Sequence, residues 1–81
     1  MRTVQFRPAA IRDFDGLDRV TQERITGALE RFAATGHGDV KKLQGRIGQF
    51  RLRVGKWRVF FELDTSATIA VIGIDNRGQA Y

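Results

Sequence analysis

The stretch that decides the fold is VKKLQGRIGQFRLRVGKWRVFF, which runs from Val40 to Phe61. In its second half, apolar and charged residues alternate on both sides of Gly55-Lys56, a period typical of two half-buried strands. Glycine at the first central position suits a two-residue turn of type II′. This turn predicts a hairpin with one apolar face, formed by the pairs Val54 and Trp57, Leu52 and Val59, and Phe50 and Phe61. A slip by one residue would turn all of these side chains to solvent, so the pattern determines the register.

The second face of this hairpin is basic. The same register places Arg53 opposite Arg58 and Arg51 opposite Phe60. Like charges that face each other across two strands destabilise a sheet by about 0.2–1 kcal/mol per pair. A face that gathers arginines around an outward phenylalanine is suited to an anionic partner. The other interpretation is a solvated basic face that keeps the protein soluble.

Positive charge is concentrated in residues 40–61, the basic window of the sequence. The chain has 81 residues and a net charge of +5, from 14 basic and 9 acidic side chains. Before the window, six basic residues balance six acidic ones, and after it one basic residue stands against three acidic ones. The window itself has no acidic residue and holds the basic residues Lys41, Lys42, Arg46, Arg51, Arg53, Lys56 and Arg58. The charge therefore predicts a partner that carries phosphates or acidic side chains.

Composition excludes several classes of protein. The chain has no cysteine, so it can form neither disulfides nor a thiolate zinc site. Its single histidine, His37, lies between two glycines, and we expect it to be a solvated loop residue. No apolar run approaches the ~18 residues of a membrane span, and the N-terminus lacks the apolar core of a signal peptide. We expect one domain over residues 1–81, in the cytoplasm, without a metal or cofactor.

The remaining segments predict an α+β fold in the order β-α-α-β-β-β. A short strand over residues 2–6 precedes a helix that opens at Pro8 and buries Ile11 and Phe14. A second helix begins at Asp18 or Thr21 and ends at Gly36. Residues 36–48 are expected to be loops, and the uncharged run over residues 68–74 is expected to be the central strand. The two N-terminal helices would then pack on one face of a four-stranded, mainly antiparallel sheet and leave the basic face open.

A motif over residues 43–62 resembles a known family. The pattern LxGxxGxxRxRxGxxRxxFE is followed by a hydrophobic strand and by R-x-x-x-Y over residues 77–81. Together with the order of elements, it resembles the RelE/ParE superfamily of toxins from type II toxin-antitoxin systems. The resemblance covers about half of the chain by motif. It implies a cognate antitoxin protein as a partner.

In the RelE-like branch of this superfamily, the toxin enters the ribosomal A site and inhibits translation by cutting mRNA. Cleavage proceeds by attack of the neighbouring 2′-hydroxyl and needs no metal. Carried over by motif position, the resemblance implies the catalytic residues Arg51, Arg53, Arg58, Arg77 and Tyr81. The other basic residues of the window and the outward aromatic ring are expected to bind nucleic acid, and they are Lys41, Lys42, Arg46, Lys56 and Phe60.

The sequence leaves the activity open between classes. Arginine forks bind phosphate oxygens well, but an arginine in a protein does not readily give up a proton. Tyr81 could supply a base or orient the substrate, or it could simply be a frayed terminus. Glu62 could act as a base or pair with Arg51 or Arg58. The alternatives to a ribosome-dependent endoribonuclease are a ParE-like inhibitor of DNA gyrase and an inactive member that only binds its antitoxin.

Overall fold

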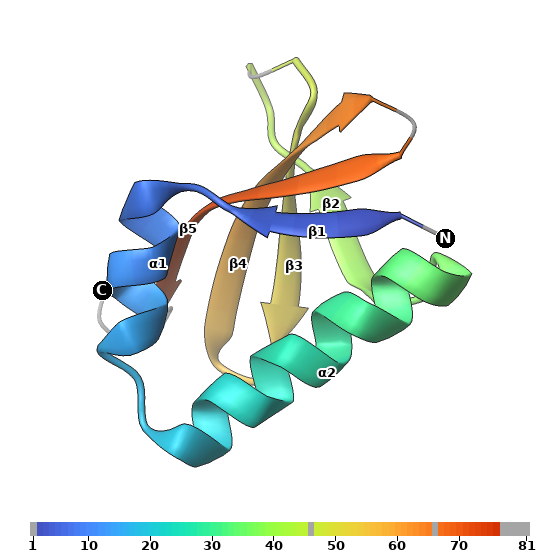
Figure 1. The fold of residues 1–81 in the computed structure, drawn as a ribbon. Coiled ribbons are helices and arrows are strands. Elements are labelled where there is room, and N and C mark those ends of the chain that lie inside the picture. Colours follow the sequence, from blue (N-terminus) through green and yellow to red (C-terminus); the bar gives the residue numbers. More distant parts are fainter. Residues whose placement is uncertain (1, 46, 66, 77–81) are drawn as a thin grey trace.

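The computed structural model describes residues 2–45, 47–65 and 67–76. The elements follow one another as β1 (Thr3–Phe6), α1 (Pro8–Asp15), α2 (Arg19–Thr35), β2 (Asp39–Lys42), β3 (Gln49–Val54), β4 (Trp57–Thr65) and β5 (Thr68–Asn76). Within these described residues, the strands form one five-stranded sheet in the order β1-β5-β4-β3-β2 (Figure 1). No helix in the described part of the chain is long and apolar enough to cross a membrane.

The α+β class is confirmed, but the expected four-stranded sheet is wrong. Residues 39–42, expected to be a loop, form β2 and pair antiparallel with β3 at the sheet edge. This segment is short and polar, so it lacks the alternation that indicates a strand, and its pairing with β3 determines its conformation. At the other edge β1 pairs parallel with β5, which makes the sheet mixed. The middle strand is β4 and not the uncharged run of β5.

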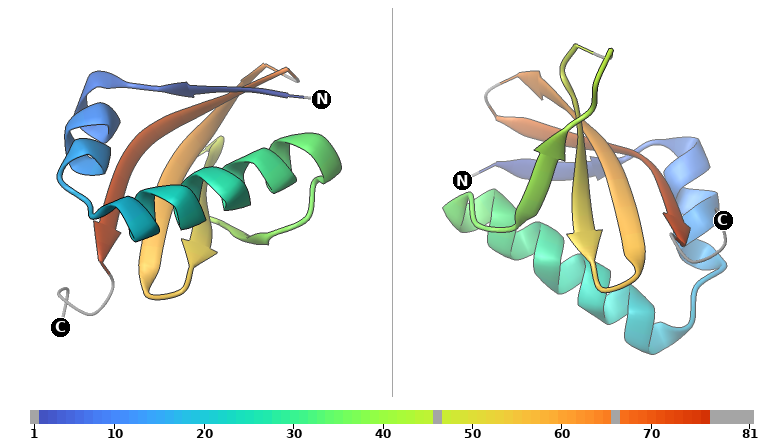
Figure 2. Two further views of the ribbon diagram at one scale, coloured as in Figure 1. Left: turned by 60° about the horizontal axis from the view of Figure 1, so that its bottom comes forward. Right: turned by 180° about the vertical axis from the view of Figure 1, so that it is seen from behind.

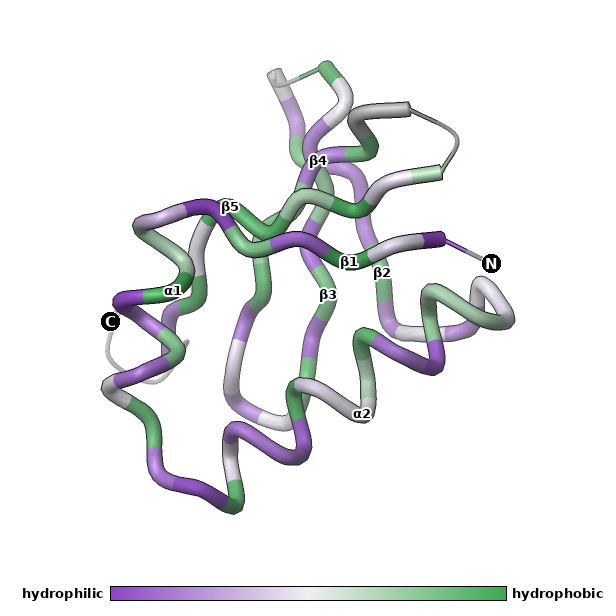
Figure 3. Tube along the Cα trace, viewed as in Figure 1, coloured by the Kyte–Doolittle hydropathy of each residue, from purple (hydrophilic) through white to green (hydrophobic). Residues whose placement is uncertain are grey.

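The hairpin that decides the fold forms as predicted. Val54 pairs with Trp57, Leu52 with Val59 and Phe50 with Phe61. Gly55 has a φ of 62°, whereas Lys56, like every described residue other than glycine, has a negative φ. A type II′ turn requires this combination at its two central residues. Figure 3 shows the resulting alternation of hydrophilic and hydrophobic residues along β3 and β4.

The core lies between the sheet and α2, which runs across one of its faces (Figure 2, left). Ile25, Leu29 and Phe32 form the buried stripe of this helix at the spacing of one helical face. Phe61 is completely buried at the centre of β4. Its ring centroid lies 5.4 Å from that of Phe32 and 5.5 Å from that of Phe50.

The first helix, α1, packs beside β5 beyond the end of β1 (Figure 1). Ala10 is fully buried there, whereas Ile11, expected in the buried stripe, is 46% exposed. A small side chain at residue 10 lets the short helix approach the strand closely. The Oδ2 atom of Asp13 accepts a hydrogen bond of 3.0 Å from the backbone N–H of Ile74. Asp13 thereby satisfies an edge donor of β5 that β1 does not reach.

Replacing Asp13 with alanine is expected to lower the free energy of unfolding by about 1–3 kcal/mol, because the part-buried N–H of Ile74 would lose its acceptor. Urea denaturation followed by circular dichroism measures the change. The matched control is Asp15→Ala, since Asp15 is exposed on the same helix. An equal effect of both substitutions would show that the loss comes from helix charge and not from the bond to β5.

Candidate functional site

The face of the sheet opposite α2 carries the predicted site (Figure 2, right). Its side chains stand in rows across the strands, as the pairing registers place them. One row contains Asp39, Arg53, Arg58 and Asp75, and the next contains Lys41, Arg51, Phe60 and Gly73. The structure therefore brings the three predicted hairpin arginines and Phe60 together on one surface.

Arg58 is held in place by Asp75, a residue that sequence reasoning did not single out. Two parallel hydrogen bonds join them, from Nε to Oδ1 at 2.9 Å and from Nη2 to Oδ2 at 3.0 Å. The guanidinium carbon also lies 5.5 Å from the centroid of the Phe60 ring. The Arg58 side chain is only 20% exposed. Its position is therefore set by a carboxylate on one neighbouring strand and an aromatic ring on its own strand.

The row of Arg53 and Arg58 is balanced in charge. Asp39 on β2 pairs with Arg53, and Asp75 on β5 pairs with Arg58 in the strand register. The like-charge pair that the hairpin predicts is present, but an acidic residue flanks it on each side. Both acidic residues lie outside the basic window of the sequence. Their position shows that the excess positive charge of this face comes from elsewhere.

That excess comes from the neighbouring row. Arg51 pairs in register with Lys41 on one side and with Phe60 on the other. Among the described residues, the Arg51 side chain makes no ion pair or hydrogen bond. Arg51 is therefore the arginine on this face whose charge is least compensated. It lies beside the one large aromatic ring that this open face presents within the described residues.

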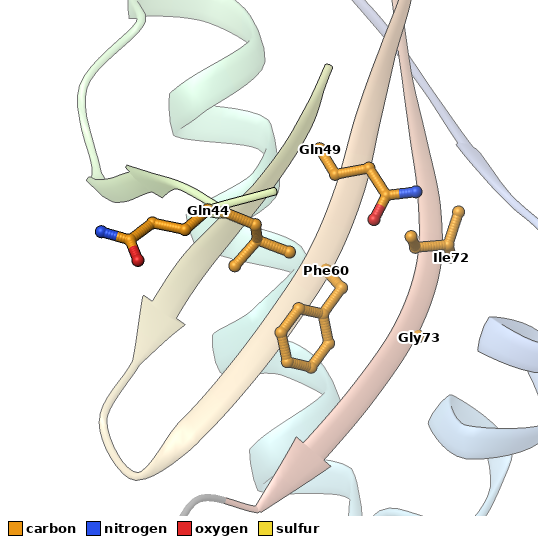
Figure 4. Close-up of a pocket in the computed structure, with 6 residues that line it drawn as sticks. Gln44, Gln49, Phe60, Ile72 and Gly73 are labelled. Carbon is orange, nitrogen blue, oxygen red and sulfur yellow. The ribbon is translucent and has the colours of Figure 1, made fainter. Parts of the chain in front are cut away.

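Phe60 also lines an open hollow of about 480 Å³ beside this row (Figure 4). The other lining residues are Leu43, Gln44, Gln49, Ile72 and Gly73. Gly73 pairs with Phe60 and has no side chain, which leaves space beside the ring. The register shifts between Phe60 and Phe61, so that Ile72 is an extra residue of β5, a bulge of the kind that redirects side chains. An apolar hollow with an aromatic wall can hold a flat ring such as a nucleobase.

The acidic residue Glu62 is engaged on the same face. Its Oε1 atom lies 3.1 Å from Nη2 of Arg7, and its Oε2 atom accepts a hydrogen bond of 3.2 Å from Nε2 of Gln49. Of the alternatives that the sequence left open for Glu62, the pairing with Arg51 or Arg58 is therefore not formed, because its partners are Arg7 and Gln49. The other amide atom, Oε1 of Gln49, is buried and has no hydrogen-bond partner among the described residues.

The remaining predicted residues divide into separate groups. Lys41 shares the open face, but Lys42 pairs with Phe50 and belongs to the opposite side of the sheet. Lys56 is exposed in the hairpin turn, and His37 is exposed in its loop as expected. Arg46, Arg77 and Tyr81 lie outside the described residues. Within the described ranges, no group of histidine and acidic side chains could hold a metal ion.

The side chains of this face are therefore suited to bind an anion together with a flat ring. Guanidinium groups bind phosphate oxygens and stabilise charge that develops on a phosphate. The aromatic hollow supplies a stacking surface next to them. Backbone phosphates and unpaired bases occur together in single-stranded nucleic acid. Of the acidic groups on this face, Glu62 and Asp75 are already engaged in ion pairs.

The chain is similar to known toxins in sequence and in fold. A family model described as the ParE toxin of type II toxin-antitoxin systems, parDE, matches residues 4–81. No curated protein matches the chain. The chain is similar to one in the RelB–RelE antitoxin–toxin complex from Methanococcus jannaschii, with 22% identity, a TM-score of 0.78, and coverage of 95% of this chain and 94% of that one.

Two further solved structures share the fold. The archaeal RelE–RelB complex from Pyrococcus horikoshii matches with 19% identity and a TM-score of 0.78, covering 96% of this chain and 97% of that one. YafQ from E. coli matches with 10% identity and a TM-score of 0.73, covering 100% of this chain and 99% of that one. At these identities the likeness concerns the fold.

Proposed function

The chain belongs to the family of ParE toxins of type II toxin-antitoxin systems. It is therefore a toxin, and we propose that it inhibits translation by cutting mRNA on the ribosome. The observation that carries the proposal is the open face of the sheet, where Arg51 has no acidic partner among the described residues and lies beside Phe60 and its hollow. A basic surface with an aromatic platform suits a single-stranded RNA substrate. RelE-type structures are among the solved structures that share the fold.

Each arginine of the face has its own role in this proposal. Arg51 binds the scissile phosphate directly, because no acidic partner competes for it among the described residues. Arg58, oriented by Asp75, stabilises the negative charge of the pentavalent phosphate. Arg53, Lys41 and Lys56 hold flanking backbone phosphates.

In this proposal, residues at the end of the chain assist the proton transfers. The neighbouring 2′-hydroxyl loses its proton as its oxygen bonds to phosphorus and forms a 2′,3′-cyclic phosphate. The bond from phosphorus to the 5′-oxygen of the next nucleotide breaks, and this oxygen takes up a proton and leaves as a hydroxyl. Arginine is a poor base and a poor acid. Tyr81 therefore positions the attacking hydroxyl or transfers its proton, and Arg77 adds positive charge at the phosphate.

An antitoxin is the proposed protein partner. Several of the solved structures that share the fold, among them those from Methanococcus jannaschii and Pyrococcus horikoshii, are antitoxin–toxin complexes. An acidic or amphipathic segment laid over the basic face would cover Arg51 and the Phe60 hollow together. Such a segment would prevent access of RNA by occupying the same guanidinium groups.

A second candidate function is inhibition of DNA gyrase without cleavage of RNA. The family model that matches the chain is that of ParE toxins. The engagement of both Glu62 and Asp75 in ion pairs also favours this candidate, because it leaves these carboxylates poorly placed as general bases. The two candidates differ in the molecule that is damaged after expression.

Induced expression of the chain alone, followed by mapping of mRNA 5′ ends, tests the proposal. We expect growth arrest with new 5′ ends inside translated frames, because cleavage on the ribosome requires a translated message. The double variant Arg58→Ala with Arg77→Ala is expected to abolish both effects. Arg12→Ala, on the exposed surface of α1, is the matched control and is expected to preserve them.

Other outcomes would change the function that is proposed for this protein. Growth arrest with intact mRNA and a DNA-damage response would replace the nuclease with the gyrase inhibitor. Cleavage that persists in the Arg58→Ala and Arg77→Ala double variant would show that the assigned roles are wrong. An absence of arrest with normal accumulation of folded protein would contradict both toxin activities.

A further inference from the structure

A second hollow, lined by arginines, lies between α2 and the end of β3 next to the hairpin turn. Its volume is about 450 Å³. The residues that line it are Glu23, Arg24, Gly27, Ala28, Arg31, Arg53 and Val54. Three of them are arginines that come from two different elements. Along the sequence, the arginines of α2 alternate with acidic residues and predict only a solvated helix surface.

The fold separates these charges. Glu30 lines a different hollow, together with Arg19, on the side of α2 that faces Phe14 of α1. Glu23, the acidic residue shared by both hollows, has its Oε2 atom 3.5 Å from Nε of Arg19. Glu30 is thus directed away from the arginine hollow, and the carboxylate of Glu23 is paired with Arg19, which does not line it. The hollow keeps an excess of positive charge.

The arginines of α2 are available to a ligand. Arg24 and Arg31 are exposed, and neither side chain has an ion pair or hydrogen bond with the described residues. They lie on one helical face two turns apart, a separation of about 10.5 Å along the axis. Gly27 and Ala28 lie between the two arginines and line the bottom of the hollow, where little or no side chain fills it. A Cβ on Gly55 would lie 3.4 Å from Nη2 of Arg24, so this guanidinium is seated against the hairpin turn.

We propose that this hollow binds backbone phosphates of an RNA strand that continues from the open face around the hairpin end of the sheet. The inference rests on the proposed function, because it assumes that RNA is the target. Arg53 belongs to the open face through its pairing with Arg58 and also lines the hollow, so the two basic surfaces are continuous. Arginine forks match phosphate oxygens in geometry and charge.

An acidic protein segment fits the hollow less well than RNA. Protein interfaces bury a hydrophobic core that is rich in aromatic side chains. Among the described residues that line this hollow, none is aromatic and only Ala28 and Val54 are apolar. Contacts to phosphates, in contrast, need no apolar surface and fix the path of a strand without reading its sequence.

The test is the salt dependence of binding between the purified chain and a short, fluorescently labelled single-stranded RNA, measured by fluorescence anisotropy. Each phosphate contact contributes about 0.7 to the slope of log K against log[salt] for single strands. Arg24→Gln and Arg31→Gln are therefore each expected to reduce the slope by about 0.7, and the double variant by about 1.4. At about 0.1 M salt, the double variant would bind about 25-fold more weakly than the unaltered chain.

Controls separate the hollow from general charge and from folding. Arg12→Gln removes one exposed arginine from α1 and is expected to leave the slope nearly unchanged. Arg24→Lys with Arg31→Lys keeps the charges and is expected to keep most of the slope. Circular dichroism shows whether each variant is folded, and the two single variants test the proposal if the double variant is not.

Failure of this inference can be distinguished from failure of the proposed function. If Arg51→Gln lowers the slope while Arg24→Gln and Arg31→Gln behave like Arg12→Gln, the hollow does not bind RNA and the open face still does. If the unaltered chain shows no salt-dependent binding of RNA, the proposed function is wrong and this inference fails with it. If the double variant loses binding of polyglutamate but not of RNA, the hollow accepts an acidic protein segment and the assignment to RNA is overturned.

Discussion

Replacing Arg51 with alanine is expected to lower the rate of mRNA cleavage about 100- to 1,000-fold, the usual effect of removing one charged group that stabilises a transition state. The expectation follows from the surroundings of this residue. Arg53 and Arg58 each have an acidic neighbour in the same row of the sheet, whereas Arg51 has Lys41 and Phe60. Loss of Arg51 therefore removes charge that no acidic residue described in its own row offsets.

The measurement is the rate of cleavage in a translating extract with purified variants. Arg51→Lys keeps the charge but loses the planar fork, so it is expected to restore only part of the activity. Arg12→Ala is the matched control for removal of an exposed arginine. Cleavage by Arg51→Ala at the rate of the Arg12→Ala control would show that Arg51 does not contact the reacting phosphate.

Stability should be almost unaffected by this substitution. Arg51 makes no ion pair or hydrogen bond with the described residues, so its removal leaves no unpaired partner behind. A loss of activity with an unchanged urea midpoint would therefore locate the defect in the chemistry of the open face. A large fall in the midpoint would contradict the role assigned here.

Replacing Phe61 with alanine is expected to lower the free energy of unfolding by about 3–5 kcal/mol, the range for truncation of a buried aromatic side chain. Phe61 has no exposed surface and is the largest of the fully buried side chains. Its ring packs between those of Phe32 on α2 and Phe50 on β3. The alanine variant would leave a cavity at the point where helix and sheet meet.

Phe60→Ala is the matched control, because Phe60 is the preceding residue of the same strand but lies on the open face. Urea denaturation of the two variants is expected to give a large loss for Phe61→Ala and a much smaller one for Phe60→Ala. The loss for Phe61 is a substantial part of the 5–15 kcal/mol that is typical of natural proteins. Similar losses for the two variants would mean that the open face is packed against something in the folded protein.

The two adjacent phenylalanines illustrate what could be predicted from the sequence. Successive residues of a strand point to opposite faces, so the alternation around Gly55 assigns Phe61 to the core and Phe60 to the open face. The same alternation predicted the hairpin register, the glycine at residue 55 predicted the type of turn, and the glycine at residue 36 predicted the end of α2. The motif over residues 43–62 led to the correct superfamily.

Several features could not be predicted because they depend on contacts between residues far apart in the chain. Asp75 orients Arg58 from 17 positions away, and Asp13 completes the edge of β5 from 61 positions away. The segment 39–42 becomes a strand only because β3 offers it an edge. Ile11 has the spacing of a core residue, but the place of α1 beside β5 buries Ala10 instead.

By itself, the sequence determined which side of the hairpin is apolar and which is basic, because that property follows from a period of two residues along one segment. Only the tertiary structure decided which of the basic residues keep their charge available. Electrostatic compensation depends on distance in space, and pairing of the strands brings Asp39 and Asp75 beside Arg53 and Arg58 but leaves Arg51 beside Lys41. The fold likewise gathers Arg24, Arg31 and Arg53 around one hollow, because α2 crosses the sheet next to the hairpin.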